Sequence, residues 1–310
     1  MSASANAPRP KLSLRTRFHA WWEGYDAKAP ETAQAEAVDD APPPPPSGPG
    51  LDRHGKPLWT ANRVEVAETL WGKGFTTPGG EEHALYLARP LGLNPAMSVL
   101  ELGAGLGGLC RALTEKFGCW TTGLEASPLL AKLGMERSAD AELAKRAPVR
   151  LYDAEKFVYD KRVDAILSRE AVFVIAEKEQ FFDRVEAQLK PRGQVVFTDY
   201  VIDPKSNLRK IEDWAAHEPQ EPHLWTADDA SAAFTQRNLD LRIAEDITET
   251  QRGLILQGLN AFTVHLASYS MDNDTKANVL NEIEIWARRM QAFAAGLRVY
   301  RFHAIKPGIM

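Results

Sequence analysis

A carboxylate and four glycines lie close together in the run Val99–Leu109 (VLELGAGLGGL). Glycine has no Cβ and tolerates positive φ, so Gly103, Gly105 and Gly108 would let a ligand approach bare backbone. Their G-x-G-x-x-G spacing is typical of dinucleotide binding. Glu101 precedes the first glycine by two residues and adds a negative charge, which suits a ligand that carries a cation or an amine.

Further polar residues follow apolar segments at regular intervals. Glu125 comes about 20 residues after the glycine turn, where an acid commonly holds ribose hydroxyls. A carboxylate can accept two hydroxyl hydrogen bonds, so the residue type fits. Asp153 and Ser168 follow the next two segments. Because ligands of open parallel sheets lie at the carboxyl ends of the strands, these residues and Glu101 predict one site for a long nucleoside ligand.

Strand and helix patterns alternate along most of the chain. Apolar runs predict strands over Met97–Leu102, Cys119–Glu125, Val149–Tyr152, Val163–Leu167, Gln194–Asp199, Leu239–Thr248 and Leu297–Lys306. Helical patterns cover Ala61–Trp71, Glu81–Leu91, Gly107–Phe117, Pro128–Arg146, Glu177–Leu189, Ala227–Arg237 and Arg252–Ala295, and Pro191–Gly193 is expected to form a turn. This order predicts a doubly wound, Rossmann-like, mostly parallel sheet of seven strands.

The run E-x-G-x-G-x-G, formed by Glu101, Gly103, Gly105 and Gly107, resembles motif I of the class I S-adenosylmethionine-dependent methyltransferases. In that family the acid and the glycines cradle the methionine part of the cofactor. The resemblance therefore implies S-adenosyl-L-methionine as cofactor and methyl transfer as the activity. The cofactor-binding residues that it implies are Gly79, Glu101, Gly103, Ala104, Gly105, Gly107, Glu125, Ala126, Asp153, Ala154, Ser168 and Arg169. Asp153 would receive the adenine amino group, with a helix or turn cap as its alternative role.

Two other segments resemble the phosphoethanolamine methyltransferase and cyclopropane fatty acid synthase branch of that family. The stretch GKGFTTPGG, which ends at Gly80, looks like the branch's entrance segment over the cofactor. The long helical segment before the last strand looks like its lid. We therefore expect a flexible, disordered arm and Pro-rich linker over 1–50 and a methyltransferase domain over 51–310, with entrance helices at 51–90 and a helical lid at 249–296.

The expected acceptor site lacks the branch's usual catalytic pair. Val174 stands where that branch has a histidine, and Trp59 stands roughly where it has a tyrosine. Because Val174 and Trp59 replace that pair, we expect a largely apolar pocket whose nearest ionisable group is Glu170. Such a pocket is compatible with methyl transfer, which needs a base only when the nucleophile arrives protonated. Glu170 is the first catalytic candidate, followed by His265 and His223. The acceptor would be a small molecule or a lipid, methylated on nitrogen or carbon.

His265 also has an alternative reading, since it lies one helical turn before Tyr269 and the two could form a packing or surface pair. Two further functions stay open. The chain could be a regulatory protein that binds the cofactor without turnover, because the usual histidine is absent. It could also be a nicotinamide oxidoreductase, because its glycine spacing and Glu125 fit a dinucleotide, although Glu101 argues against this.

Composition narrows the partners. The net charge of −5 gives no general attraction to nucleic acid or to an anionic membrane.

No run approaches the roughly 18 apolar residues of a membrane span, and a signal-peptide pattern is not found, so a cytoplasmic protein is expected. Cys110 and Cys119 lack metal-site spacing and are expected to be reduced core residues, and no metal is expected. The basic and aromatic segment 11–25 could form a helix that docks on a protein or a membrane surface.

Overall fold

The computed structural model describes residue 48, residues 50–266 and residues 273–308. Its strands are β1 (Ser98–Leu102), β2 (Trp120–Glu125), β3 (Val149–Leu151), β4 (Val163–Arg169), β5 (Leu189–Ile202), β6 (Asp240–Asp246) and β7 (Leu297–Ile305). They form one seven-stranded sheet in the order β3-β2-β1-β4-β5-β7-β6. All pairs from β3 to β5 are parallel, whereas β7 runs antiparallel to both β5 and β6. The predicted mostly parallel, doubly wound sheet is thereby confirmed.

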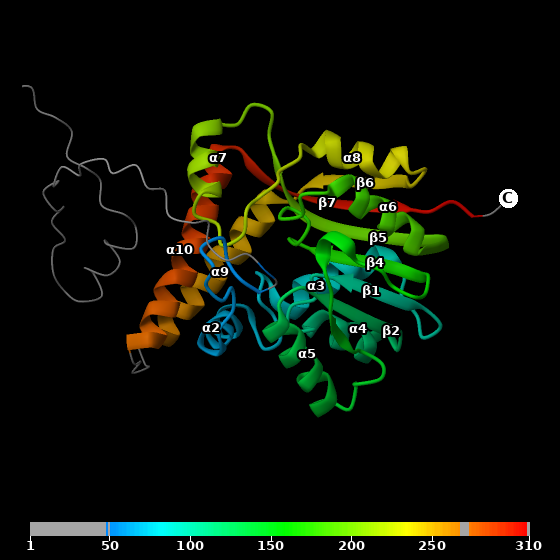
Figure 1. Ribbon diagram of the computed structural model, residues 1–310, viewed down its shortest axis with the longest axis horizontal. Helices are drawn as coiled ribbons and strands as arrows, with labels where there is room; N and C mark the ends of the chain where they lie inside the picture. Colours follow the sequence, from blue (N-terminus) through cyan, green and yellow to red (C-terminus); the bar gives the residue numbers. More distant parts are fainter. Residues whose placement is uncertain (1–47, 49, 267–272, 309–310) are drawn as a thin grey trace, which may run out of the picture.

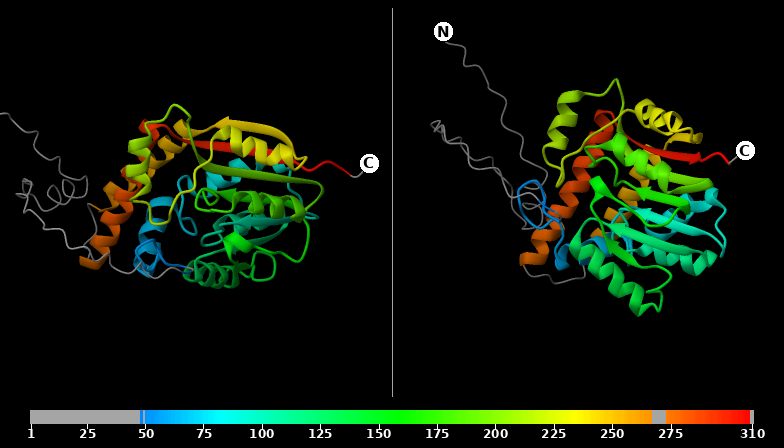
Figure 2. Two further views of the ribbon diagram at one scale, coloured as in Figure 1. Left: turned by 45° about the horizontal axis from the view of Figure 1, so that its top comes forward. Right: turned by 45° about the vertical axis from the view of Figure 1, so that its right-hand side comes forward.

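The helices cover both faces of the sheet and one of its ends. They are α2 (Ala61–Trp71), α3 (Gly80–Ala88), α4 (Gly108–Phe117), α5 (Pro128–Asp140), α6 (Lys178–Gln188), α7 (Leu208–Ala215), α8 (Ala227–Gln236), α9 (Thr248–Leu266) and α10 (Asn273–Ala295), with 3-10 turns η1 (Arg89–Leu91) and η2 (Ala154–Lys156). Figure 1 shows α2, α7 and α10 at the left of the sheet, opposite the C-terminus. Both views of Figure 2 show α2 and α10 in the same place.

The period of two along the strands explains the two apolar layers. Val99 and Leu167 belong to the core that includes α3, α4 and α9. Leu100 and Leu102 belong to the core of α6 and α8 on the other face. Because alternate side chains of a strand point to opposite faces, Glu101 lies on the same face as Val99, next to α4. The sheet therefore carries an acidic side chain into the α4 layer at the point where β1 ends.

Two local predictions were wrong, and one helix was missed. The helix that begins at Pro128 ends at Asp140, six residues before the expected Arg146. The expected turn Pro191–Gly193 lies inside β5, where a register shift between Leu189 and Gln194 lets the chain bulge without ending the strand. Helix α7 was not predicted.

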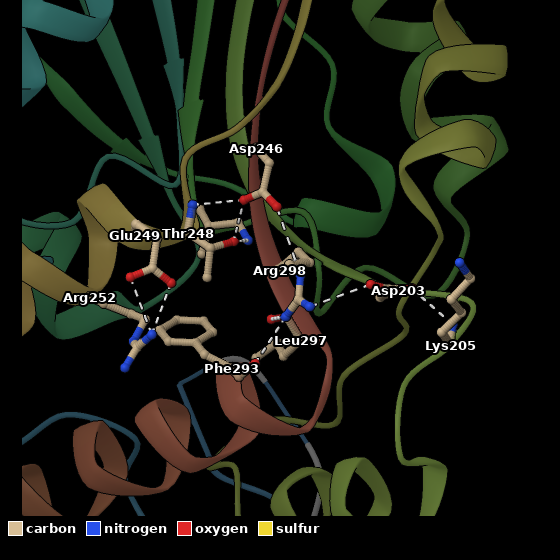
Figure 3. Close-up of polar contacts among 10 residues, drawn as sticks. Asp203, Lys205, Asp246, Thr248, Glu249, Arg252, Phe293, Leu297 and Arg298 are labelled. Atoms are coloured by element: carbon tan, nitrogen blue, oxygen red, sulfur yellow. Dashed lines mark hydrogen bonds and ion pairs between the residues drawn. The ribbon is translucent and has the colours of Figure 1, made fainter.

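The expected lid is two helices, α9 and α10, in the described part of the chain. A polar cluster ties both to the sheet (Figure 3). Asp246 at the end of β6 accepts a 2.8 Å hydrogen bond from the amide of Thr248, which begins α9. The hydroxyl of Thr248 in turn accepts a 2.9 Å bond from the amide of Val299 in β7. Arg298 forms ion pairs with Asp246 at 3.8 Å and with Asp203 at 3.4 Å, so the strand that follows α10 is fixed to the same point.

The domain boundaries remain predictions, because residues 1–47 and 49, and with them the proposed docking segment 11–25, lie outside the described residues. Tyr269 also falls outside them. Among the helices that the structure describes, none is long and apolar enough to cross a bilayer. Both cysteines are free and buried, as expected.

Candidate functional site

A cavity of about 200 Å³ lies at the carboxyl ends of β1, β2 and β4. Residues that directly follow these strands, among them Gly103, Ala126 and Glu170, line one side of it. Side chains of α2 and α10, including Arg63 and Trp286, line the other. This is the edge of the sheet at which the sequence predicts the ligand.

The glycine turn between β1 and α4 keeps this edge open. Gly103 and Gly105 line the cavity and have left-handed backbone, with φ of +74° and +56°. A Cβ on Gly103 would lie 2.4 Å from the Cβ of Ala171, and one on Gly105 would lie 3.2 Å from Oγ1 of Thr76. Any larger residue would therefore strain the turn and fill the space that a ligand needs.

Gly107 has a different place from the one predicted. It is the left-handed N-cap of α4, with φ of +69°, and a Cβ there would lie 2.5 Å from Cγ2 of Val149. It is not among the residues that line the cavity. Its glycine is required for packing against β3, and the structure gives it no contact with the ligand space.

Glu125 connects the glycine turn to the end of β2. One carboxylate oxygen accepts a 2.7 Å hydrogen bond from the amide of Gly105, and the other accepts a 2.7 Å bond from the amide of Ser127. The residue is 8% exposed and lines the cavity. Burial raises its pKa, and these backbone donors oppose the rise. Each oxygen keeps a lone pair, so the carboxylate can still accept hydrogen bonds from a ligand.

Glu101 lines a narrow arm of the cavity, about 30 Å³ in volume, together with Ala104 and Arg169. Gly103, Gly105 and Arg169 line both spaces, so the arm lies directly beside the main cavity. Glu101 is 5% exposed and accepts a 3.0 Å hydrogen bond from the thiol of Cys110. Burial raises its pKa to about 7, although Cys110 and Arg169 pull it down. A cation entering the arm would favour the ionised carboxylate.

The middle of the entrance segment lines the cavity, whereas its end does not. Thr76 and Thr77 line both parts of the cavity. Gly79, predicted to bind the cofactor, is instead the left-handed N-cap of α3, and a Cβ there would lie 2.5 Å from the Cβ of His83. It lines a separate hollow between α3 and α9. Arg169 donates a 3.0 Å bond to the carbonyl of Pro78, which holds the segment against β4.

Two other predicted contacts lie off the cavity wall. Asp153 is exposed and accepts a 3.0 Å bond from the amide of Glu155, so it caps η2, while its predicted contact with the adenine stays a prediction. Its neighbours Tyr152 and Ala154 line the cavity in its place. Ser168 is buried, and its hydroxyl donates a 3.0 Å bond to the carbonyl of Leu102, joining β4 to β1.

Among the catalytic candidates, Glu170 lies on the cavity wall. It has a left-handed φ of +46°, and its Oε1 accepts a 2.8 Å bond from the hydroxyl of Thr198. Within the described residues its Oε2 is buried without a hydrogen-bond partner. Phe173 and Val174 line the cavity beside it, which agrees with the expected apolar surface. Of the catalytic candidates with a described side chain, Glu170 is therefore the one that lies on the cavity wall.

Of the two candidate histidines, only His223 has a described side chain. His223 is half-buried, its amide donates a 2.7 Å bond to the carbonyl of Phe173, and it does not line the cavity. His265 lies near the end of α9, at a position whose side chain is outside the described part of the chain.

Besides Glu170, two ion pairs that were not predicted also line the cavity. Arg289 pairs with Glu218 at 2.8 Å, and Arg63 pairs with Glu282 at 2.9 Å. Sequence reasoning missed them because the partners are far apart along the chain. The one available signal was the spacing of Glu282 and Arg289 in a predicted lid helix, where two charges seven residues apart share a face.

Residues 81–242 match the family model described as a methyltransferase domain. That segment is more than half of the chain. The chain belongs to the methyltransferase-domain family. Membership confirms the resemblance read from motif I and argues against a nicotinamide oxidoreductase.

Curated relatives that match the chain include three enzymes named for N-methylation. The chain is 29% identical over 147 residues to phosphoethanolamine N-methyltransferase 2 of Caenorhabditis elegans, covering 47% of this chain and 33% of the relative. It is 25% identical over 231 residues to phosphoethanolamine N-methyltransferase 1 of Zea mays, covering 74% and 45%. It is 30% identical over 152 residues to the Plasmodium falciparum enzyme, covering 48% and 56%. The chain thus spans about half or less of these relatives.

Solved structures share the fold. Phosphoethanolamine N-methyltransferase 2 of Haemonchus contortus, in complex with S-adenosyl-L-methionine, superposes with a TM-score of 0.70 at 20% identity, covering 81% of this chain and 62% of that one. Geranyl diphosphate C-methyltransferase of Streptomyces coelicolor superposes with a TM-score of 0.57 at 18% identity, covering 73% and 75%. Similarity at this level confirms the class I methyltransferase architecture.

Proposed function

We propose that this protein transfers a methyl group from S-adenosylmethionine to the nitrogen of a small-molecule acceptor. The observation that carries the proposal is Glu125, whose carboxylate lines the cavity while it accepts the amide of Gly105. This arrangement places an acceptor for hydroxyl groups and a bare glycine turn side by side. Family membership and the cofactor named in the H. contortus structure support the same activity.

The residues of the cavity fit the cofactor part by part. Glu125 would accept the ribose hydroxyls, since its oxygens keep free lone pairs. Tyr152 and Ala154 offer a flat, partly apolar wall for the adenine. The narrow arm offers Glu101 to the amino group and Arg169 to the carboxylate of the methionine part. The arm therefore matches a zwitterion with one group of each sign.

The cofactor supplies a methyl group on a sulfonium, and transfer forms a nitrogen–carbon bond while the electrons of the broken carbon–sulfur bond remain on sulfur. The protein's own task is to align the acceptor and to exclude water. Phe173 and Val174 provide the apolar surface for this. Glu170 would accept a hydrogen bond from the acceptor's amine and take up or pass on the proton that the methylated nitrogen releases.

Two measurements test the proposal. Calorimetry with S-adenosylhomocysteine should show binding, and its absence at about 50 µM, a concentration that detects micromolar affinities, would refute cofactor binding. Labelled S-adenosylmethionine with a panel of amines should then yield a methylated product. The carbon chemical shift of the new methyl group distinguishes an N-methyl from a C-methyl product, and the latter would refute nitrogen as the acceptor.

The alternative is a regulatory protein that binds the cofactor without turnover. The observation that favours it is the apolar Val174 on the cavity wall, at the position where the phosphoethanolamine methyltransferase branch has a histidine. Under this alternative S-adenosylhomocysteine binds normally, yet no component of a cell extract receives the labelled methyl group. Any labelled product that depends on the wild-type protein decides for the enzyme.

A further inference from the structure

The side of the cavity opposite the glycine turn is built from charges that already satisfy one another. We call Arg63, Glu218, Glu282, Trp286 and Arg289 the acceptor wall, because all five line the cavity from α2, α10 and the loop after α7. The glutamates are almost fully buried, with side chains 3% exposed for Glu218 and 2% for Glu282. Charges buried to this degree are retained only where they have partners.

The first pair of the acceptor wall is bidentate. Nε and Nη2 of Arg289 donate to the two carboxylate oxygens of Glu218 at 2.9 and 2.8 Å. The indole of Trp214 also donates to Glu218, at 2.7 Å. The guanidinium of Arg289 lies 4.6 Å from the ring centre of Trp286. Both the charge of this arginine and the face of the indole beside it are therefore engaged before any acceptor arrives.

The second pair joins α2 to α10 and again combines an arginine, a glutamate and a tryptophan. Nε of Arg63 donates to Glu282 at 2.9 Å, and the indole of Trp286 donates to the other oxygen of Glu282 at 2.9 Å. The guanidinium of Arg63 lies 4.2 Å from the ring centre of Trp59 and also donates to the carbonyl of Leu58. The second arginine is thus neutralised in the same way as the first.

The charges around the cavity leave little room for an anionic acceptor. Three arginines and four glutamates line it: Arg63, Arg169, Arg289, Glu125, Glu170, Glu218 and Glu282. A phosphate that took over Nε and Nη2 of Arg289 would have to displace Glu218, and a buried glutamate without its partner is strongly destabilising. A phosphate that left the pair intact and used only Nη1 would add its charge to a set of lining side chains with four carboxylates and three guanidinium groups.

We infer that the acceptor is an amine that carries neither a phosphate nor a carboxylate, an inference that rests on the proposed methyl transfer. What the wall leaves to the acceptor is the apolar surface of Val174 and Ile285 and the carboxylate of Glu170. Because Oε2 of Glu170 has no hydrogen-bond partner within the described residues, an amine N–H would supply one. This separates the chain from the three curated relatives described above, which are named for phosphoethanolamine.

The test uses the full chain saturated with S-adenosylhomocysteine and measures binding of inorganic phosphate, phosphoethanolamine and ethanolamine by calorimetry. Wild type should bind neither phosphate-containing probe at about 10 mM, a concentration that detects even millimolar dissociation constants. Glu218→Gln releases Arg289 from its charge partner and keeps an oxygen for Trp214, so this variant should bind phosphate at least about tenfold more tightly than wild type.

A second variant guards against misfolding. Glu282→Gln releases Arg63 by the same logic and should also gain phosphate affinity, while either variant counts only if it binds S-adenosylhomocysteine as wild type does. Phosphoethanolamine binding by wild type overturns the inference and leaves the proposed methyl transfer standing. The inference is also overturned if Glu218→Gln and Glu282→Gln both bind S-adenosylhomocysteine as wild type does and neither gains phosphate affinity. Failure of wild type to bind S-adenosylhomocysteine overturns the proposed function itself, and the inference with it.

Discussion

The buried carboxyl of Glu101 makes cofactor affinity depend on pH. Burial raises the pKa of this group to about 7, above its ordinary value of 4.5. If the ammonium group of the cofactor requires the ionised form, the apparent dissociation constant is the intrinsic one divided by the ionised fraction. That fraction is about one tenth at pH 6 and about nine tenths at pH 8, so affinity should rise about tenfold over this range.

Calorimetry with S-adenosylhomocysteine at pH 6, 7 and 8 checks this expectation. Glu101→Gln should bind more weakly at pH 8 and lose the dependence, because a neutral amide does not titrate. Cys110→Ala removes the thiol that lowers the pKa of Glu101, and should move the midpoint of the dependence to higher pH. A flat profile in wild type, or an equal slope in Glu101→Gln, would refute the reasoning.

The same carboxyl should affect the stability of the unliganded protein with the opposite trend. Its folded-state pKa lies above the unfolded value, so the folded chain binds the proton more tightly. The contribution of Glu101 to the free energy of unfolding therefore falls as pH rises from about 4.5 to about 7. Glu101→Gln should remove this part of the pH dependence, which urea denaturation at pH 5 and pH 8 would measure.

Three further outcomes are expected. Glu125→Ala should weaken S-adenosylhomocysteine binding by roughly 1–3 kcal/mol in calorimetry, because ligand hydroxyls and the amide of Gly105 lose a charged acceptor. Glu170→Gln should lower kcat by about tenfold or more and leave cofactor affinity nearly unchanged, as single-turnover rates would show, because its place is beside the acceptor. Asp246→Ala should lower the melting temperature by roughly 2–4 °C, because α9 loses its cap.

Each of these has a matched control or a contrary result. Glu136→Ala, on the exposed side of α5, should bind S-adenosylhomocysteine like wild type, and an equal loss there would discredit the Glu125 result. An equal loss of cofactor affinity and rate in Glu170→Gln would assign that residue to the cofactor. Asp240→Ala removes an exposed carboxylate from the start of β6 and should leave the melting temperature unchanged.

The cofactor side of the site could be predicted because its signals are local in sequence. The glycines at Gly103 and Gly105 need left-handed backbone, and that need fixes the strand, the turn and the helix around them. Glu125 was found from its spacing, because a strand that pairs in parallel with β1 must end beside the turn. Gly107 and Gly79 satisfied the same patterns, yet packing against Val149 and His83 accounts for them.

The acceptor side could not be predicted, because its groups meet only through tertiary contacts. Arg289 and Glu218 are 71 residues apart, and Arg63 and Glu282 are 219 apart. Composition and periodicity carry no record of such pairings. Trp286 is a buried core residue, and its indole nitrogen also donates to the buried carboxylate of Glu282. Helix periodicity alone cannot separate these two roles.

The position of α10 beside the cavity determines how much of the cavity wall the family match covers. Arg63, Glu282 and Arg289 all lie outside residues 81–242, the segment that matches the family model. Glu170 and Glu218, which also line the cavity, lie inside that segment. The family match therefore covers the strand ends and only part of the opposite wall, so the side chains that α2 and α10 contribute can differ between members that share the matched segment.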